Sequence, residues 1–205
     1  MEKDYLKYYH PQFLIFLVVG GFFLIYLIKE SFGLSLSVFG VLSILIISIT
    51  KYLWKFKPFS WLFWIEDFSG RYEGKLIYQY QDENGEVMSG ELEHIKIISQ
   101  TGSQINVASF TKKPDGSISS PSINKGMYVE NTEDGQHYKL IYNYLNEGST
   151  DQGFPPHYGT EVIKFIEDGD TKRLSGGYFT NRNPYQTKGE FRELKWVSNN
   201  KKHDF

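Results

Sequence analysis

Two long stretches without a charged residue lie near the N-terminus, and they limit what this part of the chain can fold into. The first covers residues 13–28 and the second covers residues 32–50. A helix needs roughly 20 mostly apolar residues to cross a bilayer, and a core helix of a soluble protein would show a polar face that neither stretch has. The sequence therefore predicts a transmembrane hairpin in residues 1–57, with spans at about 11–29 and 32–53.

The lysines around these stretches indicate how the hairpin is oriented. Five lysines flank the outer ends of the two spans: Lys3, Lys7, Lys51, Lys55 and Lys57. The connecting loop carries Lys29 alone. Because lysine and arginine accumulate on the cytoplasmic side of a membrane, both termini are expected in the cytoplasm. A cleaved signal peptide is not expected, because the single alanine, Ala108, leaves no Ala-x-Ala cleavage site.

Small residues recur along the second stretch. They are Gly33, Ser37, Gly40 and Ser48, and their spacing places them on one side of a helix. Small side chains let helices approach closely within lipid. This face is predicted either to mediate self-association of the protein or to pack only on the first span of the same chain.

The rest of the chain has the pattern of antiparallel strands. Residues 54–64 mix aromatic side chains with lysines, which predicts an interfacial collar at residues 58–65. In residues 66–205, tyrosine and apolar side chains alternate with polar ones, and Asn-Gly and Asp-Gly pairs fall between these segments as in hairpin turns. Glycines within the segments suit the bends of a barrel. The predicted fold class is all-β: a compact antiparallel up-and-down β-barrel of about eight strands, lipocalin-like, preceded by the two-helix hairpin.

The net charge differs between the two parts of the chain. Residues 1–57 hold six lysines and three acidic residues, and the remainder holds 16 basic and 21 acidic residues. An acidic domain does not hold long nucleic acid through counterion release, so an anionic ligand would need a local site. The sequence has no cysteine, which excludes a disulfide framework and a thiolate metal site and agrees with a reducing cytoplasm.

Catalytic motifs are absent from the sequence. The five histidines lack metal-binding spacing, and there is no Gly-x-Ser-x-Gly elbow. The segment 70–75 resembles a P-loop but is one residue short and is expected on a strand. The chain is therefore predicted not to be an enzyme, and no metal or cofactor is expected.

The segment 176–189 has the chemistry of an anion-binding site. Thr180 and Arg182 share a strand face with Tyr178, and Thr187 begins the returning strand. An arginine fork beside hydroxyl groups suits a phosphate, and tyrosine rings can stack on bases. Face parity and chemistry add four further candidates: Tyr78, Asn106, Tyr142 and Tyr144. The alternatives are a solvated arginine on a hairpin tip and tyrosines that merely fill a core.

The chain resembles one known family along essentially its whole length. Two apolar spans and an aromatic collar precede a domain that opens with Phe-Ser-Gly-Arg-Tyr-Glu-Gly at 68–74 and closes with Gly-Tyr-Phe-Thr-Asn-Arg at 177–182 and Thr-Lys-Gly at 187–189. This order is similar to the two-transmembrane CBASS antiphage effectors called CD-NTase-associated protein fifteen. The resemblance implies a cytosolic barrel at the bacterial inner membrane that binds a cyclic dinucleotide from a cognate CD-NTase. It further implies ligand-induced oligomerisation, membrane disruption and death of the infected cell.

The resemblance also assigns ligand contacts. The matching motif carries them to Tyr178, Thr180, Arg182 and Thr187. One arginine pairs with only one of the two phosphates of such a ligand, and stacking tyrosines accept any base, so the base remains open. Two other functions also remain open: a membrane-tethered lipocalin-like carrier of a small apolar ligand, and a structural membrane module that docks a protein. An apolar-ligand carrier would have a barrel mouth lined by Leu, Ile and Phe.

Overall fold

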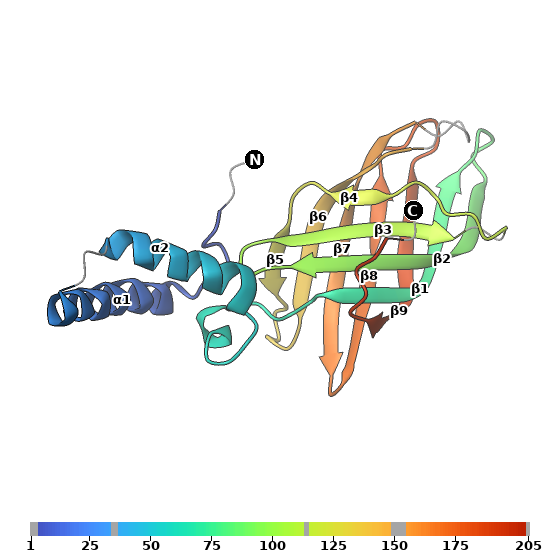
Figure 1. The fold of residues 1–205 in the computed structure, drawn as a ribbon. Coiled ribbons are helices and arrows are strands. Elements are labelled where there is room, and N and C mark those ends of the chain that lie inside the picture. The colour runs from blue at the N-terminus through green and yellow to red at the C-terminus, as the bar shows by residue number, and fades with distance from the viewer. Residues whose placement is uncertain (1–3, 34–36, 113–114, 149–154, 204–205) are drawn as a thin grey trace. The chain divides into compact units, whose positions relative to one another are not determined.

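The structure is a computed structural model of the chain, and its residues fall into two compact units. It describes residues 4–33, 37–112, 115–148 and 155–203. One unit consists of Met1–Asp67 with Gln100–Ile105, and the other of Phe68–Ser99 with Asn106–Phe205. The first unit contains the apolar helices and the second contains the barrel (Figure 1).

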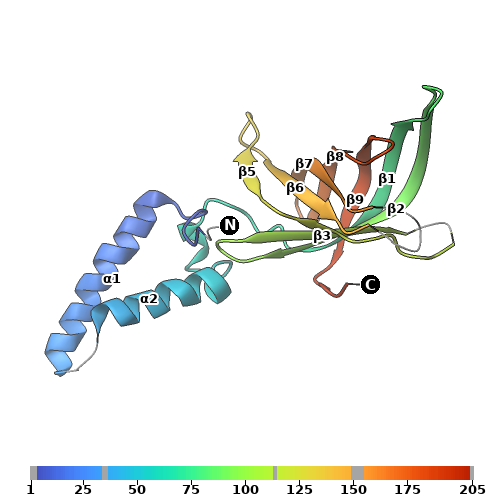
Figure 2. The same ribbon diagram turned by 90° about the horizontal axis from the view of Figure 1, so that it is seen from above.

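The N-terminal unit contains two apolar helices that form a V in Figure 2. Helix α1 is Pro11–Phe32, and helix α2 is Val38–Ser48, which continues into the π-helical segment η1 at Ile49–Leu53. Pro11 suits the first helical position, where no backbone N–H is needed. Among the described residues, α1 is the helix that is long and apolar enough to cross a membrane, and Val38–Leu53 forms a shorter apolar helix.

The break between the helices comes later than the sequence indicated. Helix α1 continues past Lys29 to Phe32 and ends at Gly33, whose left-handed backbone directs its N–H to the Lys29 carbonyl. Ser37 then caps α2 by accepting a hydrogen bond from the Gly40 N–H (3.2 Å). Of the four small residues, only Gly40 and Ser48 lie within α2, so the four do not form one helical face.

Helix α2 packs on α1 through large side chains. Leu42 is buried and approaches Gly21, and the rings of Phe22 and Phe39 lie 5.7 Å apart. Gly40 is two residues from Leu42, which is about 200° around the helix, and it is exposed. The small residue Gly40 therefore points away from the packing with α1.

The second unit is a closed antiparallel barrel (Figures 1 and 2). Its strands are β1 Gly70–Gln81, β2 Val87–Gln100, β3 Ile105–Lys112, β4 Ser122–Asn124, β5 Tyr128–Asn131, β6 Tyr138–Asn146, β7 His157–Asp168, β8 Thr171–Thr180 and β9 Thr187–Ser198. Neighbours in sequence pair around the barrel, and β9 returns to pair with β1. Because β4 and β5 pair with successive parts of β6, they act as one interrupted strand. With β4 and β5 counted as one strand, the barrel has eight strands. The predicted up-and-down barrel of about eight strands is confirmed.

The hairpin turns follow the turn residues of the sequence. In the β1–β2 turn, the Asp82 carboxylate accepts hydrogen bonds from the N–H groups of Asn84 and Glu86, both at 2.9 Å. Gly85 supplies the positive φ of 81° that this turn requires. The β7–β8 connection needs only residues 169–170. These polar turns leave the alternating residues of each strand free to divide between an inner and an outer face.

One end of the barrel is filled with apolar side chains. Phe68 packs edge-on against Phe165, with ring centroids 4.9 Å apart, and its carbonyl accepts a hydrogen bond from the Tyr72 hydroxyl (2.9 Å). Leu140 and Ile163 are completely buried beside them in the barrel interior. This closed end supplies the hydrophobic core, and the interior near the opposite end is open enough to hold a cavity.

Candidate functional site: a cavity inside the barrel

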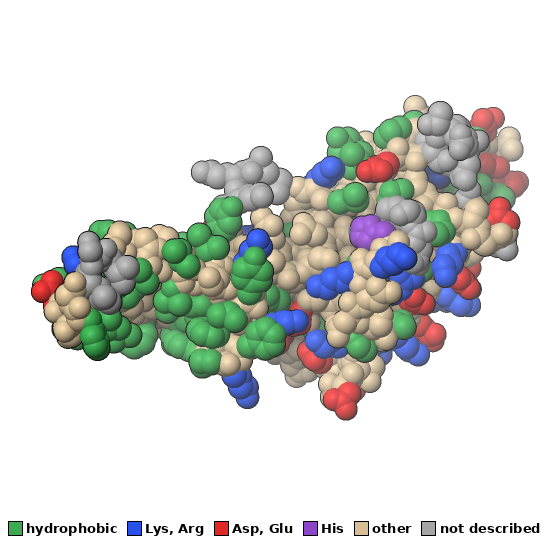
Figure 3. All heavy atoms as spheres, in the orientation of Figure 1, with side chains coloured by type: hydrophobic (Ala, Val, Ile, Leu, Met, Phe, Trp, Pro, Cys, Tyr) green, Lys and Arg blue, Asp and Glu red, His purple; other side chains and the backbone are tan. Residues whose placement is uncertain are grey.

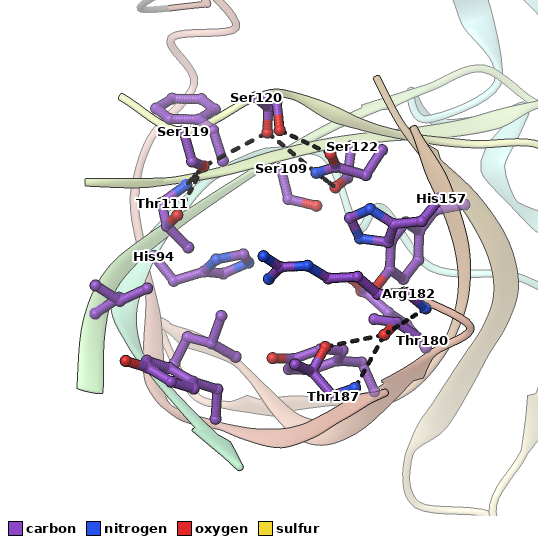
Figure 4. A pocket seen from close by; sticks show the side chains of 18 of the residues that line it. His94, Ser109, Thr111, Ser119, Ser120, Ser122, His157, Thr180, Arg182 and Thr187 are labelled. Carbon is purple, nitrogen blue, oxygen red and sulfur yellow. Dashed lines mark hydrogen bonds between the residues drawn. The ribbon is translucent and has the colours of Figure 1, made fainter. Parts of the chain in front are cut away.

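A cavity of about 630 Å³ occupies the open end of the barrel, encircled by strands in Figure 4. Ligand sites of proteins commonly have volumes of about 300–1,000 Å³. The lining residues are Leu76, Tyr78, Tyr80, Leu92, His94, Ser109, Phe110, Thr111, Ser119, Ser120, Ser122, Tyr144, Asn146, His157, Glu161, Tyr178, Thr180, Arg182, Tyr185, Thr187 and Phe191. The wall thus combines aromatic rings with a large set of hydroxyl groups, which suits a planar ligand with polar substituents.

Three of the wall tyrosines lie opposite glycines on the neighbouring strand. The register pairs Tyr78 with Gly90, Tyr144 with Gly159 and Tyr178 with Gly189. A Cβ atom added to any of these glycines would fall within 2.6 Å of the partner ring. Each ring therefore lies across the adjoining strand against the barrel wall, so that a ring face is available to the cavity.

The β8–β9 loop places the cationic residue of the cavity. The Thr180 hydroxyl accepts hydrogen bonds from the N–H groups of Arg182 (3.3 Å) and Thr187 (3.1 Å), and it lies 2.9 Å from the Thr187 hydroxyl. These bonds join the two ends of the loop. The Arg182 side chain extends into the cavity in Figure 4, where a guanidinium group could bind an oxyanion in bidentate fashion.

A second polar group lies across the cavity from Thr180 and Thr187 in Figure 4. The Thr111 hydroxyl donates to Ser119 Oγ (2.7 Å), and Ser120 Oγ donates to Asn146 Oδ1 (2.7 Å). Asn146 in turn donates from Nδ2 to Ser122 Oγ (2.9 Å). We call these five residues the hydroxyl cluster. The sequence analysis missed it, although the serine-rich run before β4 was a visible signal.

A buried ion pair lies beside Tyr142. Lys96 Nζ donates to Glu161 Oε2 (2.7 Å) and to Ser109 Oγ (3.3 Å), and the Tyr142 hydroxyl also donates to Glu161. Lys96 is completely buried and Glu161 is 3% exposed. Burial lowers the pKa of Lys96 while Glu161 opposes that shift, and burial together with Glu161 raises the pKa of Tyr142 well above its usual value. The pair neutralises itself, so it adds no net charge to the cavity.

Three titratable groups of the wall have pKa values shifted toward their neutral forms. Burial raises the pKa of Tyr178 to about 12, although a hydrogen bond with Thr187 opposes the shift, and burial also raises the pKa of Tyr144. Burial and the charge of Arg182 lower the pKa of His157. Arg182 adds a positive charge to this part of the wall.

The structure brings most of the candidate residues from the sequence together. Six of the eight line the cavity: Tyr78, Tyr144, Tyr178, Thr180, Arg182 and Thr187. Tyr142 points to the interior but is covered, because its hydroxyl is used by Glu161. Asn106 is exposed, between the buried Ile105 and Val107, and is not part of the wall. The sequence analysis therefore assigned Asn106 to the wrong face of β3, because apolar and polar side chains do not alternate clearly along this short strand.

The barrel sequence matches a known family model. The match is to the Cap15 cyclic dinucleotide receptor domain and covers residues 63–195. The chain belongs to this family. The Cap15 match contains every residue that lines the cavity, whereas α1 and α2 precede it. No curated protein matches the chain.

Membership in the Cap15 family confirms the resemblance seen in the sequence. The family is described as a receptor for cyclic dinucleotides rather than as a catalytic family. Among the residues that the structure describes, no group of three or more His, Cys, Asp or Glu side chains could hold a metal ion. The description of the family fits a ligand in the cavity rather than a cofactor.

Proposed function

We propose that this protein is an effector of a bacterial CBASS antiphage system whose barrel binds a cyclic dinucleotide second messenger. The observation that carries this proposal is the Cap15 match over 63–195, because the matched segment forms a barrel with a cavity of about 630 Å³. The cavity combines ring faces with one arginine, as a ligand with bases and phosphates requires. A cognate CD-NTase would supply the ligand after infection.

The two sides of the cavity suit the two phosphates of such a ligand. Arg182, supported by Thr180 and Thr187, would bind one phosphate through charge-assisted hydrogen bonds. The hydroxyl cluster on the other side would donate hydrogen bonds to the second phosphate. In this proposal, one arginine serves a ligand with two phosphates because neutral hydrogen-bond donors bind the second phosphate. Tyr78, Tyr144 and Tyr178 would stack on the bases between them.

The effector step is assigned to the N-terminal unit. On the face seen in Figure 3, α1 and α2 carry mostly hydrophobic side chains, whereas charged side chains gather on the barrel. Helix α1 has the length and hydropathy of a membrane span. We propose that α1 and Val38–Leu53 anchor the protein in the inner membrane as a two-span hairpin with both termini cytoplasmic. Ligand binding would then promote homo-oligomers that disrupt the lipid bilayer and kill the infected cell.

A lipocalin-like carrier of an apolar ligand is less well supported. Leu76 and Leu92 contribute apolar wall, but the mouth contains Arg182, two threonines and the hydroxyl cluster. An apolar ligand would leave these polar groups without compensation for the water that it displaces.

The proposal is tested with the full chain in lipid nanodiscs. Calorimetric titration with cyclic di-AMP, cyclic di-GMP, cyclic di-UMP and cyclic di-CMP should show saturable binding of at least one of them. A linear dinucleotide with the same bases serves as the control and should bind more weakly, because closing the ring reduces the ordering cost of binding. Absence of binding to every cyclic dinucleotide, together with binding of a fatty acid, would replace the proposal with the apolar carrier.

A further inference from the structure

His94 on β2 is a buried side chain in the cavity wall whose role the fold does not explain. It is 5% exposed and lines the cavity. Neither of its ring nitrogens hydrogen-bonds to any residue that the structure describes. Buried polar atoms in folded proteins are nearly always hydrogen-bonded, and an exception requires an explanation. Two such atoms in one side chain, at the wall of a ligand cavity, point to a partner that is not part of the chain.

The surroundings of His94 keep its ring uncharged. Burial, and then the charge of Lys96 two residues along the same strand face, hold the pKa of His94 well below its ordinary value. The ring also rests against Phe191, with centroids 5.0 Å apart. The other charged groups at this wall are Glu161 and Arg182, whose side chain extends toward His94 in Figure 4. A neutral imidazole offers one hydrogen-bond donor and one acceptor.

The groups beside His94 favour an uncharged ligand group over a phosphate. Ser109 and Glu161 also line the cavity, and both hydrogen-bond to Lys96, two residues from His94 on β2. A phosphate placed here would face a carboxylate and a neutral ring, whereas Arg182 offers it a full positive charge. His94 pairs with Gly74 on β1, farther along the strand from the open end than Tyr78. We call His94, Ser109 and Glu161 the polar floor.

We propose that the polar floor hydrogen-bonds the edge of one nucleobase of the ligand and that His94 determines which base is accepted. The base would lie between the wall tyrosines, and its edge would hydrogen-bond to the polar floor. The phosphates would bind to Arg182 and to the hydroxyl cluster. This inference rests on the proposed function, because it identifies the base-reading part of the same site. Buried donors and acceptors discriminate strongly, because a ligand that fails to match them leaves them unpaired.

The test compares His94→Leu with the unaltered full chain in nanodiscs. Affinities are measured for cyclic di-AMP, cyclic di-GMP, cyclic di-UMP and cyclic di-CMP. The substitution should weaken the best-bound ligand at least tenfold and reduce the differences among the four. In the absence of ligand, His94→Leu should melt at the same or a higher temperature, because it removes two unsatisfied nitrogens from an apolar contact with Phe191. A histidine that merely supported the fold would give the opposite result.

The matched control is His137→Leu. His137 also has a buried nitrogen, Nδ1, without a hydrogen bond among the described residues, but it does not line the cavity. This substitution should leave both the ranking and the absolute affinities of the four ligands unchanged. His94→Gln, whose amide group offers both hydrogen-bond donors and an acceptor, should restore part of the discrimination lost in His94→Leu.

Four outcomes would overturn the inference. An unchanged ranking in His94→Leu would remove His94 from base recognition while leaving the proposed function intact. Loss of folding in His94→Leu would assign His94 to the fold. If the unaltered chain binds more tightly at pH 6 than at pH 8 and His94→Leu shows no such difference, a protonated His94 contacts a phosphate of the ligand. If the unaltered chain binds none of the four cyclic dinucleotides, the proposed function itself fails, and this inference fails with it.

Discussion

At the scale of single residues, the cavity separates positive charge from neutral hydrogen-bonding groups. Arg182 carries its charge on the loop after β8, while the buried Lys96 is neutralised by Glu161. His94, Tyr144 and Tyr178 are held in their neutral forms, because burial lowers the pKa of the histidine and raises the pKa of both tyrosines. An anionic group of a ligand is therefore attracted to Arg182. The rest of the cavity wall can recognise the shape and the hydrogen-bonding groups of the ligand. Because of this division, single substitutions can measure separately how much the charged residue and the neutral residues contribute to ligand binding.

Arg182→Ala should weaken all cyclic dinucleotides by a similar factor. A hydrogen bond to a charged group contributes about 1.5–3 kcal/mol, which corresponds to a loss of about 10- to 100-fold in affinity. The order of preference among the four bases should stay the same, because phosphate contacts position a ligand without reading its bases. Calorimetry on the full chain measures both quantities, and a melting curve verifies that the barrel is intact. Affinities that do not change would remove Arg182 from the site.

The stability of the barrel should fall as the pH is lowered below about 6.5. His94 has a folded pKa well below that of the unfolded chain, so the unfolded chain binds more protons in this window and acid favours unfolding. For one such group the slope approaches about 1.4 kcal/mol per pH unit. Chemical denaturation between pH 7.5 and 5.5 measures it. The slope should be smaller in His94→Leu, although His157 retains a contribution of the same sign. Equal slopes in the two proteins would contradict the assignment.

At the scale of strands, the tyrosine wall depends on glycines in the adjoining strands. Tyr144 lies across Gly159, where an added Cβ would come within 2.3 Å of the ring. Gly159→Ala should push the ring from the wall into the cavity, lowering ligand affinity and destabilising the barrel by about 1–3 kcal/mol. Gly126→Ala is the matched control, because its Cβ would meet no atom within 4 Å. Crystal structures and titrations of both variants test this, and a Gly159→Ala protein with normal affinity would contradict it.

The same strands show how far a sequence predicts such a site. Period-two alternation and hairpin turns locate the strands and the inward face that carries Tyr78, Tyr144 and Tyr178, because each depends on neighbouring residues alone. The pairing of Lys96 with Glu161 joins residues 65 positions apart, and it depends on the closure of the barrel. Strand parity assigns each residue to a face without specifying its partner across the interior. His94 and the hydroxyl cluster were missed for this reason.

The helical unit shows a similar limit. The apolar stretches predict two helices, but the end of α1 depends on the backbone at Gly33. The run of charged and polar residues at 29–31 suggested a loop. A lysine in the last turn of a helix is favourable next to the helix dipole, so α1 continues through this run to Phe32.

At the scale of the whole molecule, the lack of cysteine permits a direct test of the two-span topology. Glu30→Cys places a thiol near the predicted connection between the spans, and Lys201→Cys places one near the C-terminus. A membrane-impermeant maleimide added to cells with a permeabilised outer membrane should label the first and not the second. The positive-inside distribution of lysines is the physical reason. Labelling of both thiols after lysis is the control. Labelling of Lys201→Cys before lysis would show that the C-terminus lies outside the cytoplasm and would contradict the predicted topology.

The coupling of ligand binding to the membrane should depend on the exposed side of α2. Leu42 packs against α1 at Gly21, whereas Gly40 is about 200° from Leu42 around the helix and is exposed. Gly40 is thus available for close contact with a second copy within lipid, where small residues permit helices to approach. Gly40→Leu should weaken ligand-dependent oligomers in nanodiscs and reduce killing, without changing ligand affinity.

Gly20→Leu on α1 makes the same change at a site where an added Cβ atom meets no atom within 4 Å. It should oligomerise and kill as the unaltered protein does, which separates the effect of a specific helix face from that of added bulk. Cross-linking with and without ligand, alongside a growth assay, measures both steps. If Gly40→Leu also forms normal oligomers and kills normally, self-association uses another surface and this face of α2 has no role in it.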